Sequence, residues 1–297
     1  MEIENALTCS DARGRMDQSC PAWDHNVALG VACGATHEEA MVSLDHQLKA
    51  GHSPSWPQGS EAEASFDLLG EPGGFAGELA RYVTPFRRRI GHWLTPATAL
   101  MPLLTNPSKR RCTFSLANPG WMINFKLRFS GDVAVDGSPP LHTNNLFQGG
   151  NFDSTYNANR TLMLAPPAPL GKMRKVVLAA IISGHGNMEF LPSTHTFEIN
   201  GEAFTVSSEG VAGTDMGCTT HVRQGRAQPN EHGTWYTGRN FWCNGADVPV
   251  HHFDVTAAVA KGAPVNVTYH ASGPGGAAPG KHGGGNIVLS SVLAWSV

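Results

Sequence analysis

Residues 217–254 read GCTTHVRQGRAQPNEHGTWYTGRNFWCNGADVPVHHFD, and two cysteines, Cys218 and Cys243, enclose the first two thirds of this stretch. Glycine and proline recur throughout the enclosed segment, which excludes a regular helix or a long strand. A long irregular loop in a compact domain is usually either functional or disordered. Its aromatic residues argue against disorder, so the pattern predicts an ordered loop around which the rest of the chain is built.

The side chains of this loop are those of a binding surface. Trp235 and Trp242 offer flat apolar faces, while Glu231 and Arg239 offer hydrogen bonds, a combination that suits a sugar or another polar ring. A disulfide closing the loop would remove about 3–4 kcal/mol of loop entropy from the unfolded chain. The alternative interpretation is a stapled structural loop whose tryptophans belong to the core.

The rest of the chain predicts an all-β protein. Among 297 residues, 34 glycines and 20 prolines are typical of a loop-rich β fold, and short alternating runs are separated by turns. One of these turns, Asn200-Gly201, is typical of a tight hairpin. One helix is expected at residues 36–50, where Thr36 and Glu39 form a capping box.

We therefore predict two antiparallel β-sandwiches. The first spans residues 1–135, with an insertion at about residues 35–77 that includes the helix, and the second spans residues 136–297.

The sequence separates loop-like segments from strands in several places. Residues 1–25 are polar and rich in turn formers, and residues 131–150 resemble an interdomain connection or a long loop. The apolar run at residues 175–182 predicts a strand that ends in a turn at residues 183–186. The segment 251–260 is expected to be a strand.

Charge excludes several partners. Charged residues make up 15% of the chain and the net charge is −3, which gives no support for a nucleic-acid or membrane-surface partner. No apolar stretch is long enough to span a bilayer, and the first residues lack the apolar region of a signal peptide. The histidines show no zinc or copper spacing, and no nucleophile or phosphate-loop motif is present, so no metal and no cofactor are expected.

The six cysteines form an even set. Cys9 and Cys20 bracket a short loop, which leaves Cys33 and Cys112 as a possible third pair beside Cys218 and Cys243, although six cysteines allow fifteen connectivities. Two N-glycosylation sequons would also suit a secretory route. We therefore expect an oxidising compartment, although the missing signal sequence is evidence against it.

Two carboxylates stand out by their neighbours. Asp24 follows Trp23 and precedes a strand, and Glu189 follows the expected turn and precedes the hairpin. Acids beside aromatic groups on loops above a sandwich can acquire different pKa values and so divide general-acid and general-base work. The alternative is that each caps a turn through backbone N–H groups.

At these residues the chain resembles the peptide-N-glycosidase F family, and more closely its eukaryotic and viral relatives. The resemblance rests on six segments that keep their order over most of the chain: CPAWDH (20–25), RYVTPFRRRIGHWLT (81–95), AAIISGHG (179–186), EFLPSTHTFEING (189–201), the stretch 217–245, and VPVHHFDVT (248–256).

The resemblance implies two adjacent eight-stranded jelly rolls with an active site at their interface, and the first is expected to be incomplete at its start. It implies an amidase that hydrolyses the bond between GlcNAc and asparagine in N-glycosylated peptides or proteins, leaves aspartate, and needs no metal. The expected partner is an N-linked glycopeptide or glycoprotein, and the expected form is a monomer in the secretory lumen or outside the cell.

Carried over by position, the two catalytic acids are Asp24 and Glu189. The cystine of the family's second domain falls on Cys218 and Cys243, and its first-domain cystine resembles Cys9 with Cys20 on a longer loop. Residues expected to bind substrate, from the resemblance and from the loop chemistry together, are Trp23, His25, Trp121, His185, Glu231, Trp235, Arg239 and Trp242.

The chain departs from the family at several positions. The family's third acid precedes a tryptophan, whereas here Asn118-Pro119-Gly120 precedes Trp121. An arginine after the first acid is replaced by His25, and cysteines flanking the second are replaced by Asn187 and Leu191. Because the sequence begins close to its first cysteine, strands that precede that cysteine in the family are expected to be missing.

Two other functions fit part of the pattern. A glycan-binding module would keep the aromatic cleft but lose turnover with the third acid. An ascorbate-dependent copper monooxygenase would share paired jelly rolls, but the chain lacks its His-x-His and methionine ligand pattern.

Overall fold

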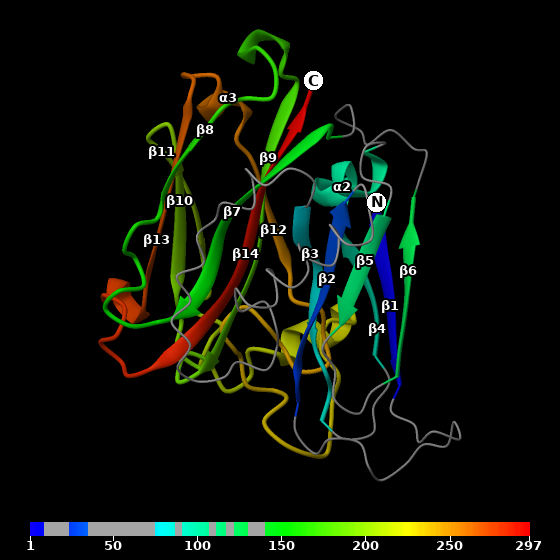
Figure 1. Ribbon diagram of the computed structural model, residues 1–297. Coiled ribbons are helices and arrows are strands. Elements are labelled where there is room, and N and C mark those ends of the chain that lie inside the picture. The colour runs from blue at the N-terminus through cyan, green and yellow to red at the C-terminus, as the bar shows by residue number, and fades with distance from the viewer. Residues whose placement is uncertain (9–23, 35–74, 87–90, 107–110, 117–121, 130–139) are drawn as a thin grey trace.

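The computed structural model describes residues 1–8, 24–34, 75–86, 91–106, 111–116, 122–129 and 140–297 (Figure 1). The expected helix at residues 36–50, most of the insertion, the Cys9 and Cys20 positions and the predicted domain boundary near residue 135 lie outside these ranges. The insertion was expected to reach residue 77, but strand β3 already begins at Phe75.

The first half of the chain forms two three-stranded antiparallel sheets. One has the order β4-β1-β6, from Gly91–Pro96, Glu2–Thr8 and Met122–Arg128. The other has the order β3-β2-β5, from Phe75–Val83, Asn26–Gly34 and Arg111–Leu116. A short helical segment, η3 (Thr98–Leu100) and α2 (Met101–Thr105), follows β4.

The second half is an eight-stranded jelly roll. One sheet has the order β12-β9-β14-β7, from Val250–Asp254, Lys175–Gly186, Gly285–Ser296 and His142–Asn151. The other has the order β11-β10-β13-β8, from Glu202–Ser207, Thr194–Ile199, Val265–Ser272 and Thr161–Leu164. Numbered from β7, the two sheets read 1-8-3-6 and 2-7-4-5, the strand order of a jelly roll. The predicted all-β fold class is therefore confirmed.

Short helical turns connect the strands of this jelly roll. They are η4 (Leu170–Lys172), η5 (Thr219–Gln224), α3 (Thr256–Val259) and η6 (Pro274–Gly276). Segment 251–260 is therefore a strand only as far as Asp254. The Asp254 carboxylate accepts hydrogen bonds from the Thr256 backbone N–H and hydroxyl, which ends the strand and starts α3.

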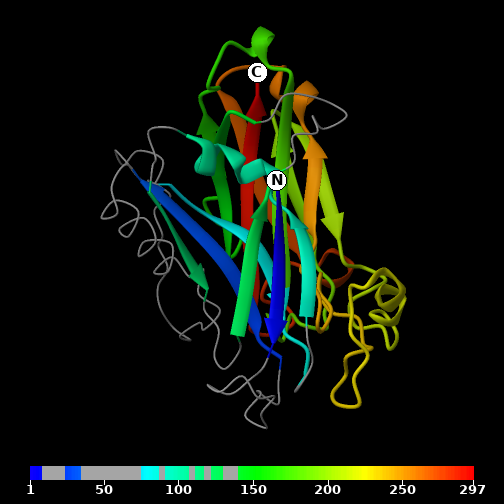
Figure 2. The ribbon, with the colours of Figure 1, turned by 90° about the vertical axis from the view of Figure 1, so that its right-hand side faces the viewer.

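The apolar run of β9 is buried on both faces. Val176, Leu178, Ala180 and Ile182 enter the core of the jelly roll, whereas Ala179 packs into the core cluster of the first half. A strand covered on both sides needs no polar alternation, which explains the continuous run. Figures 1 and 2 show the two halves side by side, with β9, β12 and β14 next to the first half.

Three expectations about chain segments were wrong. Residues 2–8 form β1, the central strand of its sheet, and residues 142–151 form β7 at the edge of the second half. The expected turn at residues 183–186 is still part of β9, paired with β14 as far as Gly186. Neighbouring strands supply the hydrogen-bond partners for the backbone of these polar or glycine-rich segments. Local sequence does not reveal which distant strand will pair with a segment.

The hairpin at Asn200-Gly201 is confirmed by the pairing of β10 with β11. The two strands that flank Asn118-Pro119-Gly120, in contrast, pair in different sheets, β5 with β2 and β6 with β1. The turn itself lies outside the described residues. No helix in the described part of the chain is long and apolar enough to cross a membrane.

The packing of the jelly-roll core predicts a large cost for truncating Leu178, which is fully buried on β9. Leu178→Ala should lower the free energy of unfolding by about 2–5 kcal/mol because it removes buried methyl groups and leaves a cavity. The control is Leu141→Ala, at a side chain that is 65% exposed, with an expected change within about 0.5 kcal/mol. Urea unfolding measures both, and equal effects would contradict the assignment of this core.

Candidate active site

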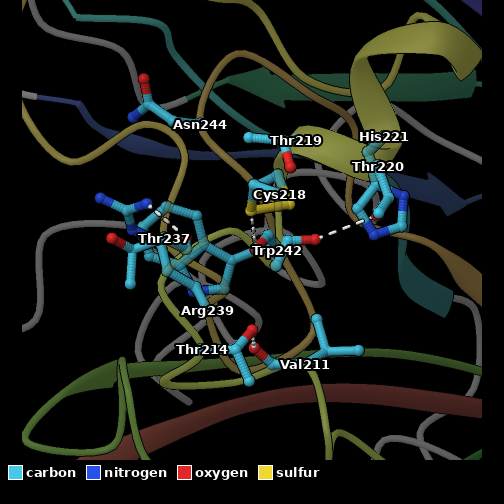
Figure 3. The surroundings of a disulfide bond; sticks show 12 residues. Val211, Thr214, Cys218, Thr219, Thr220, His221, Thr237, Arg239, Trp242 and Asn244 are labelled. Atoms are coloured by element: carbon cyan, nitrogen blue, oxygen red, sulfur yellow. Dashed lines mark hydrogen bonds between the residues drawn. A yellow bond between two sulfur atoms is a disulfide. The ribbon is translucent and has the colours of Figure 1, made fainter.

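The loop between Cys218 and Cys243 is closed by a disulfide with an S–S distance of 2.05 Å (Figure 3). It begins with η5 and has no strand, so its backbone polar groups must find other partners. Gly238 lets it lie against the preceding loop, since a Cβ at Gly238 would be 1.9 Å from the Val211 carbonyl oxygen. A second disulfide joins Cys33 on β2 to Cys112 on β5.

Asn240, which is fully buried, ties this loop to the end of β9. Its carboxamide oxygen accepts hydrogen bonds from the hydroxyls of Ser193 (2.9 Å) and Ser208 (2.6 Å), and its carboxamide nitrogen donates to the Met188 carbonyl. Its backbone N–H donates to the Glu189 carbonyl over 2.8 Å. Asn240 therefore fixes the backbone on which Glu189 is carried.

Asn244 ties the same loop to the first half of the chain. Its carboxamide nitrogen donates to Asp24 Oδ2 over 2.9 Å, and its carboxamide oxygen accepts from the Phe86 backbone N–H. The neighbouring His25 is held at its backbone, because its N–H donates to Thr84 Oγ1 and its carbonyl accepts from the Thr84 N–H. Asp24 therefore stands at the junction of the two halves.

Arg239 lies between the two predicted catalytic acids. Its Nε donates to Glu189 Oε1 over 2.9 Å, and its guanidinium also donates to Thr234 and Thr237. The side chain of Arg239 is 2% exposed, whereas that of Glu189 is 27% exposed. The guanidinium of Arg239 therefore holds Glu189 in place and leaves part of the Glu189 carboxylate open to a ligand.

Burial raises the pKa of both acids. For Asp24, the nearby charge of Arg239 and the hydrogen bond from Asn244 oppose this rise. For Glu189, the hydrogen bond and charge of Arg239 oppose it, whereas the negative charge of Asp24 raises the pKa further. Two partly buried carboxylates under the influence of one cation are suited to general acid–base chemistry.

Trp242 packs against the Arg239 guanidinium, and His185 packs against Trp242. The guanidinium carbon lies 4.8 Å from the centre of the Trp242 ring, and the His185 ring stacks on Trp242 at 5.4 Å. The Trp242 indole N–H donates to the Gly184 carbonyl, and the side chain is only 5% exposed. Trp242 is thus placed to support Arg239 more than to offer a free face to a sugar.

The remaining expected binding residues are dispersed. Trp235 is half-buried with its ring edge against Tyr236, and Glu231 is exposed beside His232. Phe190, which follows Glu189, is 39% exposed and lies 5.1 Å from the Arg239 guanidinium. Trp23 and Trp121 lie outside the described residues.

Sequence reasoning missed Asn240 and Asn244. Asn240 binds the backbone of Met188 and Glu189, and Asn244 binds the side chain of Asp24 in the first half of the chain. The available signal was their position: two asparagines flank Phe241, Trp242 and Cys243 in a segment with few other polar groups. A buried asparagine beside a cystine must find hydrogen-bond partners, and loops of other segments are the usual source.

Arg239 and Trp242 also line a cavity of about 190 Å³. Arg226, Asp247 and Phe241 contribute to its wall, so it offers both charged and apolar contacts, but neither Asp24 nor Glu189 lines it. Across the described ranges, no cluster of three or more His, Cys, Asp or Glu side chains that could hold a metal ion is present.

Comparison with known proteins finds a relation for the second half of the chain. Residues 158–294 match the family model of peptide-N-glycosidase F, C terminal. This half is therefore similar to a peptide-N-glycosidase F C-terminal domain. The resemblance to this family predicted from the sequence is therefore confirmed, and no curated protein matches the chain in sequence.

Solved structures show the same fold over the whole chain. Recombinant peptide:N-glycanase F superposes with a TM-score of 0.53 at 15% identity, covering 100% of this chain and 84% of that one. The glycosylasparaginase peptide-N-glycosidase F from Flavobacterium meningosepticum gives 0.52 at 15% identity, covering 99% and 84%. A PNGF-II structure gives 0.56 at 15% identity, covering 99% of this chain and 56% of that chain.

The hydrogen bond from Asn244 predicts a change in the titration of Asp24. Asn244→Ala removes an interaction that lowers the Asp24 pKa, so that pKa should rise above its already raised value. Carboxyl ¹³C NMR of Asp24 as a function of pH measures the shift.

The control for this titration is Asn157→Ala, which removes a carboxamide that binds the backbone of Ala271. It should leave the Asp24 titration unchanged. An unchanged or lowered Asp24 pKa in Asn244→Ala would contradict the geometry described for the junction.

Proposed function

We propose that the protein is an amidase that hydrolyses the bond between GlcNAc and asparagine in N-glycosylated peptides or proteins, releasing the glycan and leaving aspartate. The observation that carries the proposal is that Arg239 binds Glu189 of the second half while its charge also acts on Asp24 of the first half. The relation of residues 158–294 to peptide-N-glycosidase F adds support.

In the proposed reaction, water attacks the carbonyl carbon of the asparagine side chain, and the amide bond between that carbon and the nitrogen attached to the sugar breaks. Asp24 accepts the proton of the attacking water, or polarises the linkage directly. Glu189, whose pKa is raised by burial, orders water or protonates the leaving amine. The water oxygen remains in the new aspartate, and the glycan leaves as a glycosylamine.

Arg239 has two roles in this proposal. It fixes the orientation of Glu189, and its charge limits the rise of both carboxyl pKa values. The buried Trp242 supports Arg239 from below, so the expected contacts to the first two sugars of the glycan are left to Arg239 and Trp23. The two disulfides are typical of an oxidising compartment, and we place the enzyme in the secretory lumen or outside the cell as a monomer acting on N-glycoproteins.

Incubation of a denatured N-glycoprotein in H₂¹⁸O tests the reaction directly. Mass spectrometry should show asparagine converted to aspartate with one ¹⁸O, together with released glycan. Asp24→Asn and Glu189→Gln should each lower kcat by about 10²–10⁴-fold, because each removes a proton-transfer group.

The control is Glu202→Gln, at an exposed carboxylate on β11 that pairs with Lys261, and it should keep full activity. An intact glycopeptide after long incubation with oxidised, folded protein would refute the amidase. Retained glycan affinity in that case would support the binding-module alternative, which the missing third acid favours.

The charge of Arg239 predicts a shift in the pH dependence of activity. Loss of the charge in Arg239→Met lets both carboxyl pKa values rise further, so the acidic limb of kcat/KM, set by the ionised base, should move to higher pH. Arg239→Lys keeps the charge and should shift the limb less. A limb that stays in place, or moves to lower pH in Arg239→Met, would exclude this role for the arginine.

A further inference from the structure

A fully buried ion pair within β3 of the first half also binds the second half of the chain through its arginine. Arg81 on β3 is 0% exposed and binds Glu78 with two hydrogen bonds, from Nε over 2.8 Å and from Nη2 over 2.5 Å. Its third nitrogen, Nη1, donates to Ser183 Oγ over 2.9 Å and to the Val288 carbonyl over 2.7 Å. Ser183 and Val288 belong to β9 and β14, so the arginine of one half is bound by the other.

Ser183 passes this contact on to His185. Its hydroxyl oxygen lies 2.8 Å from His185 Nε2 and is buried with 0% exposure. Because an arginine can only donate, the Ser183 oxygen already accepts from Arg81. Among the described residues the hydroxyl proton has one acceptor within reach, His185 Nε2, and leaving that proton unpaired in a buried place would be costly.

We propose that Arg81 is a positioning residue for the Glu189–Arg239 pair, and that it acts through Ser183 by holding His185 in the tautomer with its proton on Nδ1. The line of contacts then continues from the His185 ring to Trp242, and from Trp242 to the Arg239 guanidinium. The role in turnover rests on the amidase proposed above, whereas the tautomer does not.

The charge of Arg81 reinforces this arrangement. Burial lowers the pKa of His185 to about 3, and the positive charge of Arg81 lowers it as well. The ring is therefore neutral near neutral pH and adds no second positive charge beneath Arg239. A neutral, oriented ring supports Trp242 without weakening the attraction between Arg239 and the two acids.

The location of Arg81 has a consequence for assembly. Glu189, Arg239, Trp242 and His185 all belong to the second half, yet their support reaches them from β3. We expect the acid pair to reach its full geometry only when the two halves are packed together.

Nitrogen-15 NMR of the wild-type protein is the first test, with the His185 signals assigned by their loss in His185→Gln. The expected result is a protonated Nδ1 and an unprotonated Nε2 across neutral pH. A protonated Nε2 would overturn the proposal whether or not the protein is an amidase.

The second test is the double variant Glu78→Met with Arg81→Met. Replacing both members by apolar side chains of similar size avoids an unpaired buried charge, so the fold is expected to survive. Ser183 loses its donor, both His185 tautomers become populated, and kcat should fall roughly tenfold while KM stays within about twofold. Ser183→Ala interrupts the same line at one hydroxyl and should lower kcat in the same direction.

The control is Thr143→Val, which removes another hydrogen bond between the two halves, from Thr143 Oγ1 to the Ala99 carbonyl over 2.6 Å. It should keep the wild-type tautomer and kcat. A folded Glu78→Met/Arg81→Met protein with the wild-type tautomer and kcat would overturn the proposal. An inactive wild-type protein with the expected tautomer would refute the amidase instead, and the role of Arg81 in holding the His185 tautomer would remain supported.

Discussion

The site depends on how one irregular loop satisfies its buried polar groups. The loop from Cys218 to Cys243 contains no strand, so side chains must supply the hydrogen bonds that a neighbouring strand would otherwise provide. Asn240 binds the loop to the end of β9, and Asn244 binds it to the start of the first half. The disulfide limits the loop in the unfolded chain, and the two asparagines determine where it lies in the folded one.

A single buried cation organises the charges of the site. Arg239 is held between Trp242 and Phe190 and donates to Glu189, and its charge also acts on Asp24. Both acids are partly buried, which raises their pKa values, and the arginine limits that rise. The balance between burial and one positive charge leaves two carboxyl groups able to differ in protonation, as acid–base catalysis requires.

Much of the fold was predictable because strands of the second half alternate or are uniformly apolar. The hairpin at Asn200-Gly201 follows from its turn residues, and β9 from its apolar run. Strands β1 and β7 were not predictable, because their polar residues resemble loops. The central position of β1 between β4 and β6 supplies its hydrogen bonds, and β14 supplies those of β7.

For the site, the sequence by itself determined the residue types: the cystine loop with Arg239 and Trp242, and the acids at Asp24 and Glu189, all set among turn formers. Only the tertiary structure decided that Arg239 binds Glu189, that Trp242 is buried beneath it, and that Asn244 reaches Asp24. The physical reason is that local sequence encodes propensity and alternation. Hydrogen bonds between distant loops arise only when two packed sandwiches bring their polar groups within reach and exclude water from them.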